Sequence, residues 1–374
     1  MATYADTCTA LAVALEAGTP TLLWGGAGEG KTTVIEQFAR DRGKHLETVI
    51  ASISDPTDFQ GMPYHADGKT MFSPPDWAQA IADADVDGIV FFDEISTAPP
   101  SVQAALLRPI LGKVVGSLAL PEQTRFIAAA NPPEIAADGW DLSAPLANRF
   151  VHIDWDLPAE VGSHGFTFGF EDITVPVIDT DAAAALVVEM KMRVGAFLNA
   201  RPDMKSVIPK DSPGAGRAWP RPRSWESGAR LLAYGRAGKV SQGTLNVLMM
   251  GAVGPSAARE YLTWESNLDL PDVEAAIKAK GAITLPGTAD KIMVVCGATA
   301  AAIKGNATKA RCDAAVNGIL VAIAAAGYRD LAVVALKQVA QDFQKSGAVL
   351  SPAAVEHFGA ILAEMGKIAK GTTA

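Results

Sequence analysis

The chain has 374 residues, which is long enough for two or three domains at about 150 residues per domain. Hydrophobic residues make up 49% and charged residues 20%, a composition that excludes disorder as the main state of the chain. The formal net charge of -9 does not supply the broad positive field that phosphate backbones attract, so nucleic-acid binding is not the default expectation.

The cysteine pattern and the hydropathy indicate a cytoplasmic protein. Cys8, Cys296 and Cys312 are scattered and form no CxxC pair, which argues for a reducing compartment and against a zinc site. Residues 1–20 contain no basic region followed by an apolar core, so we expect no signal peptide. No run reaches about 18 uninterrupted apolar residues, so we expect no membrane association.

The first 156 residues alternate between short apolar runs and helical segments. The runs are apolar over most of their length, as expected for strands that helices cover on both faces. This alternation predicts an α/β fold with a doubly wound, parallel, five-stranded sheet. The predicted strands are residues 21–24, 46–51, 88–92, 125–129 and 150–154.

The composition changes after the last predicted strand. Residues 157–179 are rich in Gly, Phe and Pro without periodicity, and we interpret them as a linker or an inserted loop. Residues 180–270 are predicted to be helical, with a Pro- and Arg-rich break at 209–223. Residues 271–374 contain Ala-rich amphipathic helices and form a predicted C-terminal helical extension.

A glycine-rich segment follows the first predicted strand and fits the pattern G-x-x-x-x-G-K-[ST] at every fixed position. Glycines allow the positive φ values with which backbone N–H groups can surround a phosphate, and the following helix adds its positive dipole end. Lys31 would reach the β- and γ-phosphates of ATP, and the Thr32 hydroxyl would bind Mg²⁺. The alternative is an accidental glycine turn, which the flanking strand and helix disfavour. The predicted loop consists of Gly25, Gly26, Ala27, Gly28, Glu29, Gly30, Lys31, Thr32 and Thr33.

Polar residues end the next two central strands. Asp93 and Glu94 follow the apolar run GIVFF, where Asp93 would hold the Mg²⁺ shell and Glu94 would polarise the attacking water. Asn131 follows RFIAAA and would hold this water or touch the γ-phosphate. The alternatives are acids that start a loop and an Asn that starts a turn before Pro132.

Two arginines are candidates for stabilising charge on the transferred phosphoryl group. Arg149 precedes the last strand, too far from the loop of its own subunit, so it would act on a neighbour's nucleotide and imply a closed oligomer. Arg223 begins a helix and is predicted to point at its own nucleotide. The alternatives are a surface arginine and, for the segment with Trp219 and Trp225, a basic aromatic patch for RNA or DNA.

Taken in order, GGAGEGKT, IVFFDE, AAANPP, LANRF and RPRSWE resemble the AAA+ superfamily and, within it, the MoxR-like branch. Residues 55–61 (DPTDFQG) look like the segment that enters an inserted hairpin in that branch. The resemblance covers residues 18–156 well and 180–270 loosely. It implies an αβα nucleotide-binding core over 1–156, a helical lid over 180–270, hexameric rings with ATP at subunit interfaces, and the roles given above for the site residues.

The chain also departs from that pattern. Residues 107–110 carry Arg-Pro where relatives often have acidic residues, which makes Arg108 a rival for the trans-acting arginine. The last ~100 residues match no pattern that the resemblance supplies.

Three functions from different classes fit the sequence. The leading hypothesis is a ring ATPase that remodels or matures a protein client, in some relatives beside a partner with a von Willebrand A domain. The alternative is a nucleic-acid-linked AAA+ motor, against which the acidic charge weighs. A small-molecule P-loop kinase would need neither Asn131 nor a trans-acting arginine.

Overall fold

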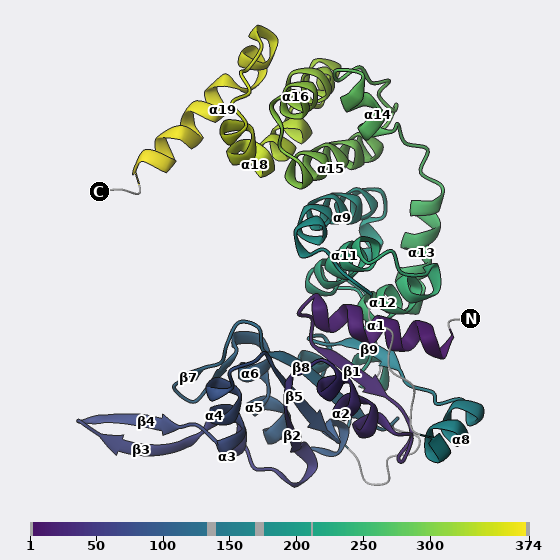
Figure 1. The fold of residues 1–374 in the computed structure, drawn as a ribbon, viewed down its shortest axis with the longest axis vertical. Helices are drawn as coiled ribbons and strands as arrows, with labels where there is room; N and C mark the ends of the chain where they lie inside the picture. The colour runs from purple at the N-terminus through teal and green to yellow at the C-terminus, as the bar shows by residue number, and fades with distance from the viewer. Residues whose placement is uncertain (1–2, 133–139, 169–175, 211, 372–374) are drawn as a thin grey trace. The chain divides into compact units, whose positions relative to one another are not determined.

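The computed structural model describes residues 3–132, 140–168, 176–210 and 212–371. The chain divides into two compact units, Met1–Ile178 with Met204–Glu260 and Asp179–Asp203 with Tyr261–Ala374. Figure 1 shows both units with their helices and strands labelled. The strands, all in the first unit, are β1 (Thr21–Trp24), β2 (His45–Ile50), β3 (Met62–Ala66), β4 (Lys69–Ser73), β5 (Gly88–Asp93), β6 (Val114–Val115), β7 (Leu118–Ala119), β8 (Arg125–Ala130) and β9 (Val151–Asp154).

Helices of the first unit precede, connect and follow these strands. They are α1 (Tyr4–Glu16), α2 (Lys31–Asp41), η1 (Ala51–Ile53), α3 (Thr57–Gln60), α4 (Asp76–Asp83), η2 (Ile95–Thr97), α5 (Pro100–Ala105), α6 (Leu107–Gly112), α7 (Ala144–Ala147), α8 (Ala159–Phe168), α10 (Ser212–Ala215), α11 (Pro222–Ala237) and α12 (Gln242–Val253). The short η3 (Pro202–Met204) and α13 (Pro255–Ser266) lie where the chain passes between the units.

The main sheet is parallel and has the strand order β2-β5-β8-β1-β9. All five predicted strands are present within one residue of their expected ends, so the predicted α/β sheet is confirmed. Strands β1 and β5 are buried on both faces because helices cover both sides of the sheet. Parallel strands direct all their carboxyl ends to one edge, which therefore gathers residues that are far apart in the sequence.

Aromatic side chains fill the core on one face of this sheet. Phe92 of β5 stacks on Phe126 of β8 with ring centroids 5.9 Å apart, and it meets the edges of Phe59 and Trp77. These four side chains belong to one buried cluster, which also includes residues of α5 and α6. Such large apolar contacts fix the carboxyl end of β5, where the acidic pair follows.

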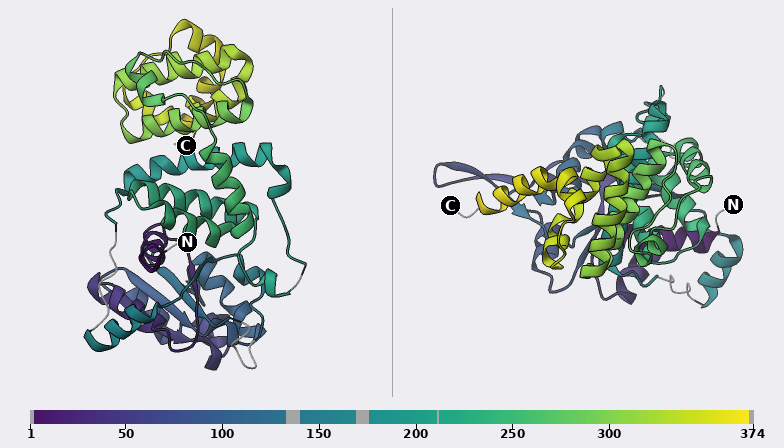
Figure 2. Two further views of the ribbon diagram at one scale, coloured as in Figure 1. Left: turned by 90° about the vertical axis from the view of Figure 1, so that its right-hand side faces the viewer. Right: turned by 90° about the horizontal axis from the view of Figure 1, so that it is seen from above.

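Two antiparallel hairpins are added to the sheet domain. Strands β3 and β4 pair directly after the segment 55–61, so the inserted hairpin expected from the resemblance is present. Figures 1 and 2 show this hairpin extending away from the rest of the first unit. At its base Gly61 has φ +83°, and a Cβ there would lie 2.5 Å from the Ser73 carbonyl oxygen, so this position requires glycine. The smaller hairpin joins β6 and β7.

The helical part of the first unit is built on strand β9. Helices α11 and α12 pack on each other and on α1, and α12 also packs on β9. The last contact is close, because a Cβ on Gly251 would lie 2.3 Å from the His152 carbonyl oxygen. The expected linker 157–179 contains the helix α8. The expected lid 180–270 is shared between the two units, since α9 (Thr180–Ala200) packs on helices of the second unit.

The second unit consists of helices around its own apolar core. Besides α9 it contains α14 (Val273–Lys278), α15 (Ala289–Gly305), α16 (Lys309–Cys312), the π-helical η4 (Asp313–Leu320), α17 (Val321–Ile323), the π-helical η5 (Ala324–Tyr328), α18 (Arg329–Lys345) and α19 (Pro352–Gly371). Helices α9 and α15 approach closely at Gly297, where a Cβ would lie 2.8 Å from the Met192 Cβ.

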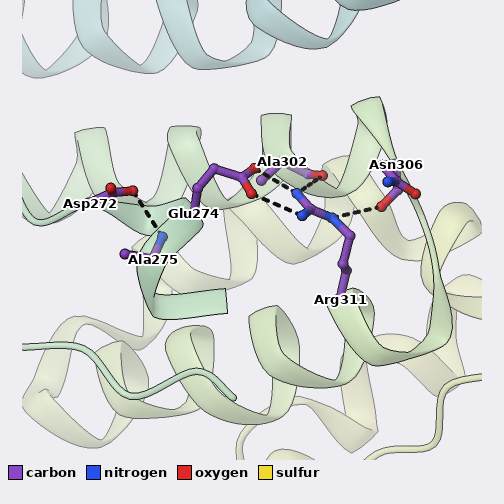
Figure 3. Close-up of polar contacts among 6 residues, drawn as sticks. All are labelled: Asp272, Glu274, Ala275, Ala302, Asn306 and Arg311. Carbon is purple, nitrogen blue, oxygen red and sulfur yellow. Dashed lines mark hydrogen bonds and ion pairs between the residues drawn. The ribbon is translucent and has the colours of Figure 1, made fainter. Parts of the chain in front are cut away.

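A charged cluster joins three helices of this unit (Figure 3). Arg311 of α16 donates to both carboxylate oxygens of Glu274 on α14, at 2.9 and 2.6 Å. Its guanidinium also donates to the carbonyl oxygens of Ala302 and Asn306 at the end of α15, where helical carbonyls lack partners. Hydrogen bonding to Arg311 lowers the pKa of Glu274. The cluster therefore fastens the carboxyl end of α15 to α14.

One helical stretch among the described residues, Lys309–Lys345, is long and apolar enough to cross a membrane by length and composition. Core helices of soluble proteins pass the same test. Ile319, Leu320 and Ile323 of this stretch belong to the buried core of the second unit.

The second unit offers a direct test of its packing. A Cβ on Gly318 would lie 2.6 Å from the Cα of Gly281, so Gly318→Ala should lower the free energy of unfolding by about 1–3 kcal/mol. Urea unfolding followed by circular dichroism measures this change. The matched control is Gly305→Ala, where no atom lies within 4 Å and helix propensity predicts a neutral or slightly stabilising effect. Equal stabilities of the two variants would contradict the packing described.

Candidate active site

The carboxyl ends of four adjacent strands meet at one edge of the sheet. Strand β1 leads into the glycine-rich loop, β5 ends in Asp93 and Glu94, and β8 is followed by Asn131. Strand β2, next to β5, leads into η1. A pocket of about 280 Å³ lies at this edge and is lined by Ala27, Gly28, Glu29, Gly30, Lys31, Thr32, Thr33, Asp93, Glu94, Ala129, Ala130 and Asn131.

The loop has the backbone geometry that its glycines predict. Gly28 and Gly30 have φ values of +80° and +72°, a region that L side chains rarely adopt. Helix α2 starts at Lys31, directly after Gly30. The N–H groups of the loop and of the first helical turn have no partner within the helix, and they suit an anion at the pocket.

Lys31 is only 8% exposed, and its ammonium is held by neutral groups. The Nζ atom donates to the carbonyl oxygens of Gly25 at 2.8 Å and Gly26 at 2.7 Å, and it lies 3.4 Å from Asn131 Oδ1. Burial lowers the pKa of Lys31, and the charges of Glu29, Asp93 and Glu94 oppose this shift. No carboxylate of the described residues is within 4.0 Å of Nζ, so an anion in the pocket would supply the missing counter-charge.

Glu29 folds back over the start of the loop. A Cβ on Gly25 would lie 2.6 Å from the Trp155 carbonyl oxygen, so this position has no room for a side chain, whereas a Cβ on Gly26 would meet only the Glu29 carboxylate, at 2.6 Å. The Glu29 backbone is held from the other side, where the Trp155 indole donates to its carbonyl oxygen at 3.2 Å. Oε2 of Glu29 is buried and has no hydrogen-bond partner among the described residues.

Asp93 and Glu94 each accept a hydrogen bond from a hydroxyl group of another segment. Thr32 Oγ1 donates to Asp93 Oδ2 at 3.0 Å, which places a hydroxyl and a carboxylate oxygen side by side next to the loop. These hard oxygen donors fit Mg²⁺, which binds through few protein ligands together with phosphates and water. Glu94 has φ +53°, and its Oε2 accepts a hydrogen bond of 2.6 Å from Ser52 Oγ.

Asn131 is fixed through its backbone. Its N–H donates to Ser96 Oγ at 3.2 Å, and Ser96 in turn contacts the Asn131 carbonyl at 3.4 Å. The side-chain amide is therefore free to turn toward Lys31 and the pocket. The structure thus brings Lys31, Thr32, Asp93, Glu94 and Asn131 together around one pocket, and the roles expected of them stay predictions.

Three residues near the pocket were not singled out from the sequence. Ser52 contacts Glu94, Ser96 holds Asn131, and Trp155 holds Glu29. Ser52 directly follows the predicted strand 46–51, and Trp155 directly follows the predicted strand 150–154. Both residues were therefore expected at the carboxyl edge of the sheet, where the site lies. Ser96 carries no such signal, because its contact depends on how η2 folds after Glu94.

The two candidate arginines lie together but outside the pocket. Arg149 lies two residues before the amino end of β9, whereas the pocket lies at the carboxyl edge of the sheet. Burial and then the charge of Arg223 lower the pKa of Arg149, so the two guanidinium groups are close to each other. Among the described residues, neither arginine has an ion pair, and Nε of Arg149 is buried without a partner.

Arg223 does not line the pocket beside Lys31, so the predicted contact of Arg223 with the nucleotide of its own subunit stays a prediction. Arg223 lies in the first turn of α11, which packs with α12 and α1 on the β9 side of the sheet. The Trp219 carbonyl oxygen accepts from Ser224 Oγ at 3.0 Å and from Asn148 Nδ2 at 3.5 Å. Because Ser224 and Asn148 are the neighbours of the two arginines, this carbonyl holds Arg223 beside Arg149. The rival candidate Arg108 is exposed on α6 and does not line the pocket either.

A buried histidine joins strand β9 to strand β1. Trp24 Nε1 donates to His152 Nδ1 at 2.8 Å, and His152 Nε2 lies 2.8 Å from the Ala147 carbonyl oxygen. These two contacts require the neutral tautomer with its proton on Nε2. Burial lowers the pKa of His152 to about 4. The Arg217 guanidinium lies over the Trp24 ring, with its Cζ atom 4.1 Å from the ring centroid. Arg217 also forms an ion pair with Asp154 at 2.8 Å.

Comparison with known proteins identifies the sheet domain. Residues 20–150 match the family described as "AAA domain (dynein-related subfamily)". Among solved structures, the chain is similar to a presumed ATPase from Cytophaga hutchinsonii, at 14% identity and a TM-score of 0.42, over 69% of this chain and 88% of that one. It is also similar to a full-length MCM homolog from Methanopyrus kandleri, at 18% identity and a TM-score of 0.36, over 68% of this chain and 54% of that one. None of the curated proteins matches this sequence.

The neutral state of His152 predicts a pH dependence of stability. The pKa of His152 is about 4 in the folded chain and 6.5 in the unfolded chain. Between pH 4 and pH 6.5 the unfolded chain therefore binds more protons at this residue than the folded chain does. The stability contributed by neutral His152 is complete above pH 6.5 and decreases as the pH falls toward 4, by about 3 kcal/mol in total.

Urea unfolding at pH 7 and at pH 4.5 tests this expectation, with His152→Gln as the control that removes the titration. The wild-type chain should lose more stability between these pH values than the variant does. An identical loss in both proteins would mean that His152 is not held neutral.

Proposed function

This chain contains an AAA domain of the AAA+ superfamily, and we propose that it hydrolyses ATP in the presence of Mg²⁺ at the pocket beside Lys31. One observation carries the proposal. A buried ammonium without a carboxylate partner lies beside a hydroxyl–carboxylate pair, at the carboxyl edge of a parallel sheet. A phosphate chain with a bound metal ion satisfies both features, because it supplies negative oxygens to Lys31 and further ligands to the metal.

Each residue at the edge has a distinct task in this reaction. Lys31 would exchange the Gly25 and Gly26 carbonyls for β- and γ-phosphate oxygens, with which the ammonium interacts more strongly. Thr32 and Asp93 would hold Mg²⁺, which supplies positive charge to the phosphate oxygens when bound.

Glu94 and Asn131 act on the attacking water. Glu94, once released from Ser52, would accept its proton, and the Asn131 amide would orient it.

The arginine pair is proposed to act on the nucleotide of a neighbouring copy. Arg149 and Arg223 are held side by side, away from the pocket of their own chain, and no acid of the described residues neutralises them. Two uncompensated guanidinium groups at a protein surface suit a phosphate group. A closed ring, which we propose to be a hexamer, would bring this pair to the next subunit's pocket.

The exposed hairpin β3–β4 favours a protein client. Met62, Tyr64 and Met71 are exposed on one face of the hairpin and Phe72 on the other, and Lys69 is the one lysine or arginine of the two strands. Exposed apolar side chains suit contact with polypeptide, whereas binding to phosphate backbones needs several basic residues. We propose a MoxR-like ATPase that remodels or matures a protein client, with a von Willebrand A-domain protein as a candidate partner. DNA- or RNA-stimulated, salt-sensitive hydrolysis would instead support a nucleic-acid motor.

Two substitutions separate nucleotide binding from hydrolysis. Lys31→Ala should reduce ATP affinity by at least roughly 100-fold, because the pocket loses its main positive charge. Glu94→Gln should bind ATP as the wild type does and lower phosphate release by at least roughly 100-fold. Calorimetry with Mg·ATP and a phosphate assay measure the two effects. Unchanged ATP affinity in Lys31→Ala would refute the assignment of the pocket.

The arginines can be tested by mixing two inactive variants. Arg149→Ala should bind ATP but fail to hydrolyse it, because its neighbour's pocket lacks the charge that it supplies. Mixing Arg149→Ala with Lys31→Ala should restore part of the activity, since the second variant supplies Arg149 to the intact pocket of the first. If mixing restores nothing although the subunits assemble, Arg149 does not act in trans, and Arg108 is the next candidate.

A further inference from the structure

A continuous set of contacts runs from the phosphate loop to the turn that carries Arg149. Trp24 is the last residue of β1 and immediately precedes Gly25, whose carbonyl oxygen binds Lys31. The Trp24 indole donates to His152, and His152 donates to the Ala147 carbonyl oxygen. Ala147 is the last residue of α7, two positions before Arg149.

The position of Arg149 depends on this short helix. The Arg149 N–H donates to the Leu146 carbonyl, and its guanidinium donates to the Pro145 carbonyl, so both backbone and side chain are held by α7. Helix α7 has only four residues and cannot define its own orientation by internal hydrogen bonds. The bond from His152 to Ala147 is a tertiary contact that fixes this helix to the sheet.

His152 is suited to this contact because it is buried and bonded at both ring nitrogens. Its Nδ1 accepts from Trp24 and its Nε2 donates to Ala147, which leaves one orientation of the ring. The two hydrogen bonds therefore fix the ring between Trp24 and the end of α7. The Arg217 guanidinium covers the other side of the Trp24 ring and limits its alternative positions.

A second series of contacts connects Trp24 to Arg223. Arg217, which covers Trp24, lies two residues before Trp219. The Trp219 carbonyl oxygen accepts from Ser224 and Asn148, the neighbours of the two arginines. Both arginines are thus connected to the residue that precedes the phosphate loop.

We propose that His152 is a positioning residue that orients Arg149, through helix α7, for the neighbouring subunit's pocket. The inference rests on the proposed function of Arg149 in trans. It assigns to His152 no contact with nucleotide. The opposing explanation is that His152 only stabilises the sheet, in which case its loss would affect every function of the subunit alike.

The mixing experiment distinguishes these explanations when His152→Leu is added to one of the two variants. In the subunit carrying Lys31→Ala, which provides the arginine, His152→Leu should lower the restored activity by at least roughly tenfold. In the subunit carrying Arg149→Ala, which provides the pocket, it should change the restored activity by less than about twofold and leave ATP affinity unchanged. His152→Phe also removes the hydrogen bond to Ala147 while keeping an aromatic ring in the buried site, and it serves as a second variant if His152→Leu does not assemble.

The outcomes separate the inference from the function on which it rests. Restored activity that depends on His152 only in the arginine-providing subunit supports the positioning role. Equal losses in both placements, or no loss in either, overturn it while leaving Arg149 in trans intact. If the unmodified pair, Lys31→Ala with Arg149→Ala, restores no activity, the trans-acting role itself fails and the inference fails with it.

Discussion

The buried ammonium of Lys31 is the constraint on which the site depends. A charge in a buried position is costly unless it is paired, and the described residues offer it carbonyl and amide oxygens but no direct carboxylate. Those neutral acceptors hold Lys31 in place without neutralising it. The Lys31 ammonium therefore remains able to pair with an anion, and a bound Mg²⁺ would offset the charges of the surrounding carboxylates.

The strand order of the sheet explains why the acidic pair and Asn131 lie close to Lys31. In the order β2-β5-β8-β1, neighbouring strands deliver Ser52, the acidic pair, Asn131 and the loop to one edge. The opposite edge, at the amino end of β9, receives Arg149, and the helices packed on β9 bring Arg223 to it. One subunit thus presents an acid-lined pocket at one edge and two arginines at the other, an asymmetry that suits head-to-tail assembly into a ring.

Local sequence patterns predicted the elements that depend on local rules. The five strands follow from apolar runs covered on both sides, and the loop follows from the backbone needs of a phosphate site. The location of Arg223 depends instead on long-range packing of α11 and α12 against α1 and β9, which no local pattern encodes. The role of His152 could not be predicted from its local sequence either, where it is simply a polar residue in a strand. Its importance depends on the hydrogen bonds to Trp24 and Ala147, which only the folded structure shows. Similarly, residues 180–200 look continuous with the following helices, yet α9 packs on α15 through the tight contact at Gly297.

A structure of the Glu94→Gln chain assembled with Mg·ATP tests the central claim most directly. The triphosphate is expected within the loop from Gly25 to Thr33, with Lys31 on its β- and γ-phosphates and with Arg149 contributed by the adjacent copy. A triphosphate bound away from this loop, or one contacted by Arg149 of the same chain, would contradict the account.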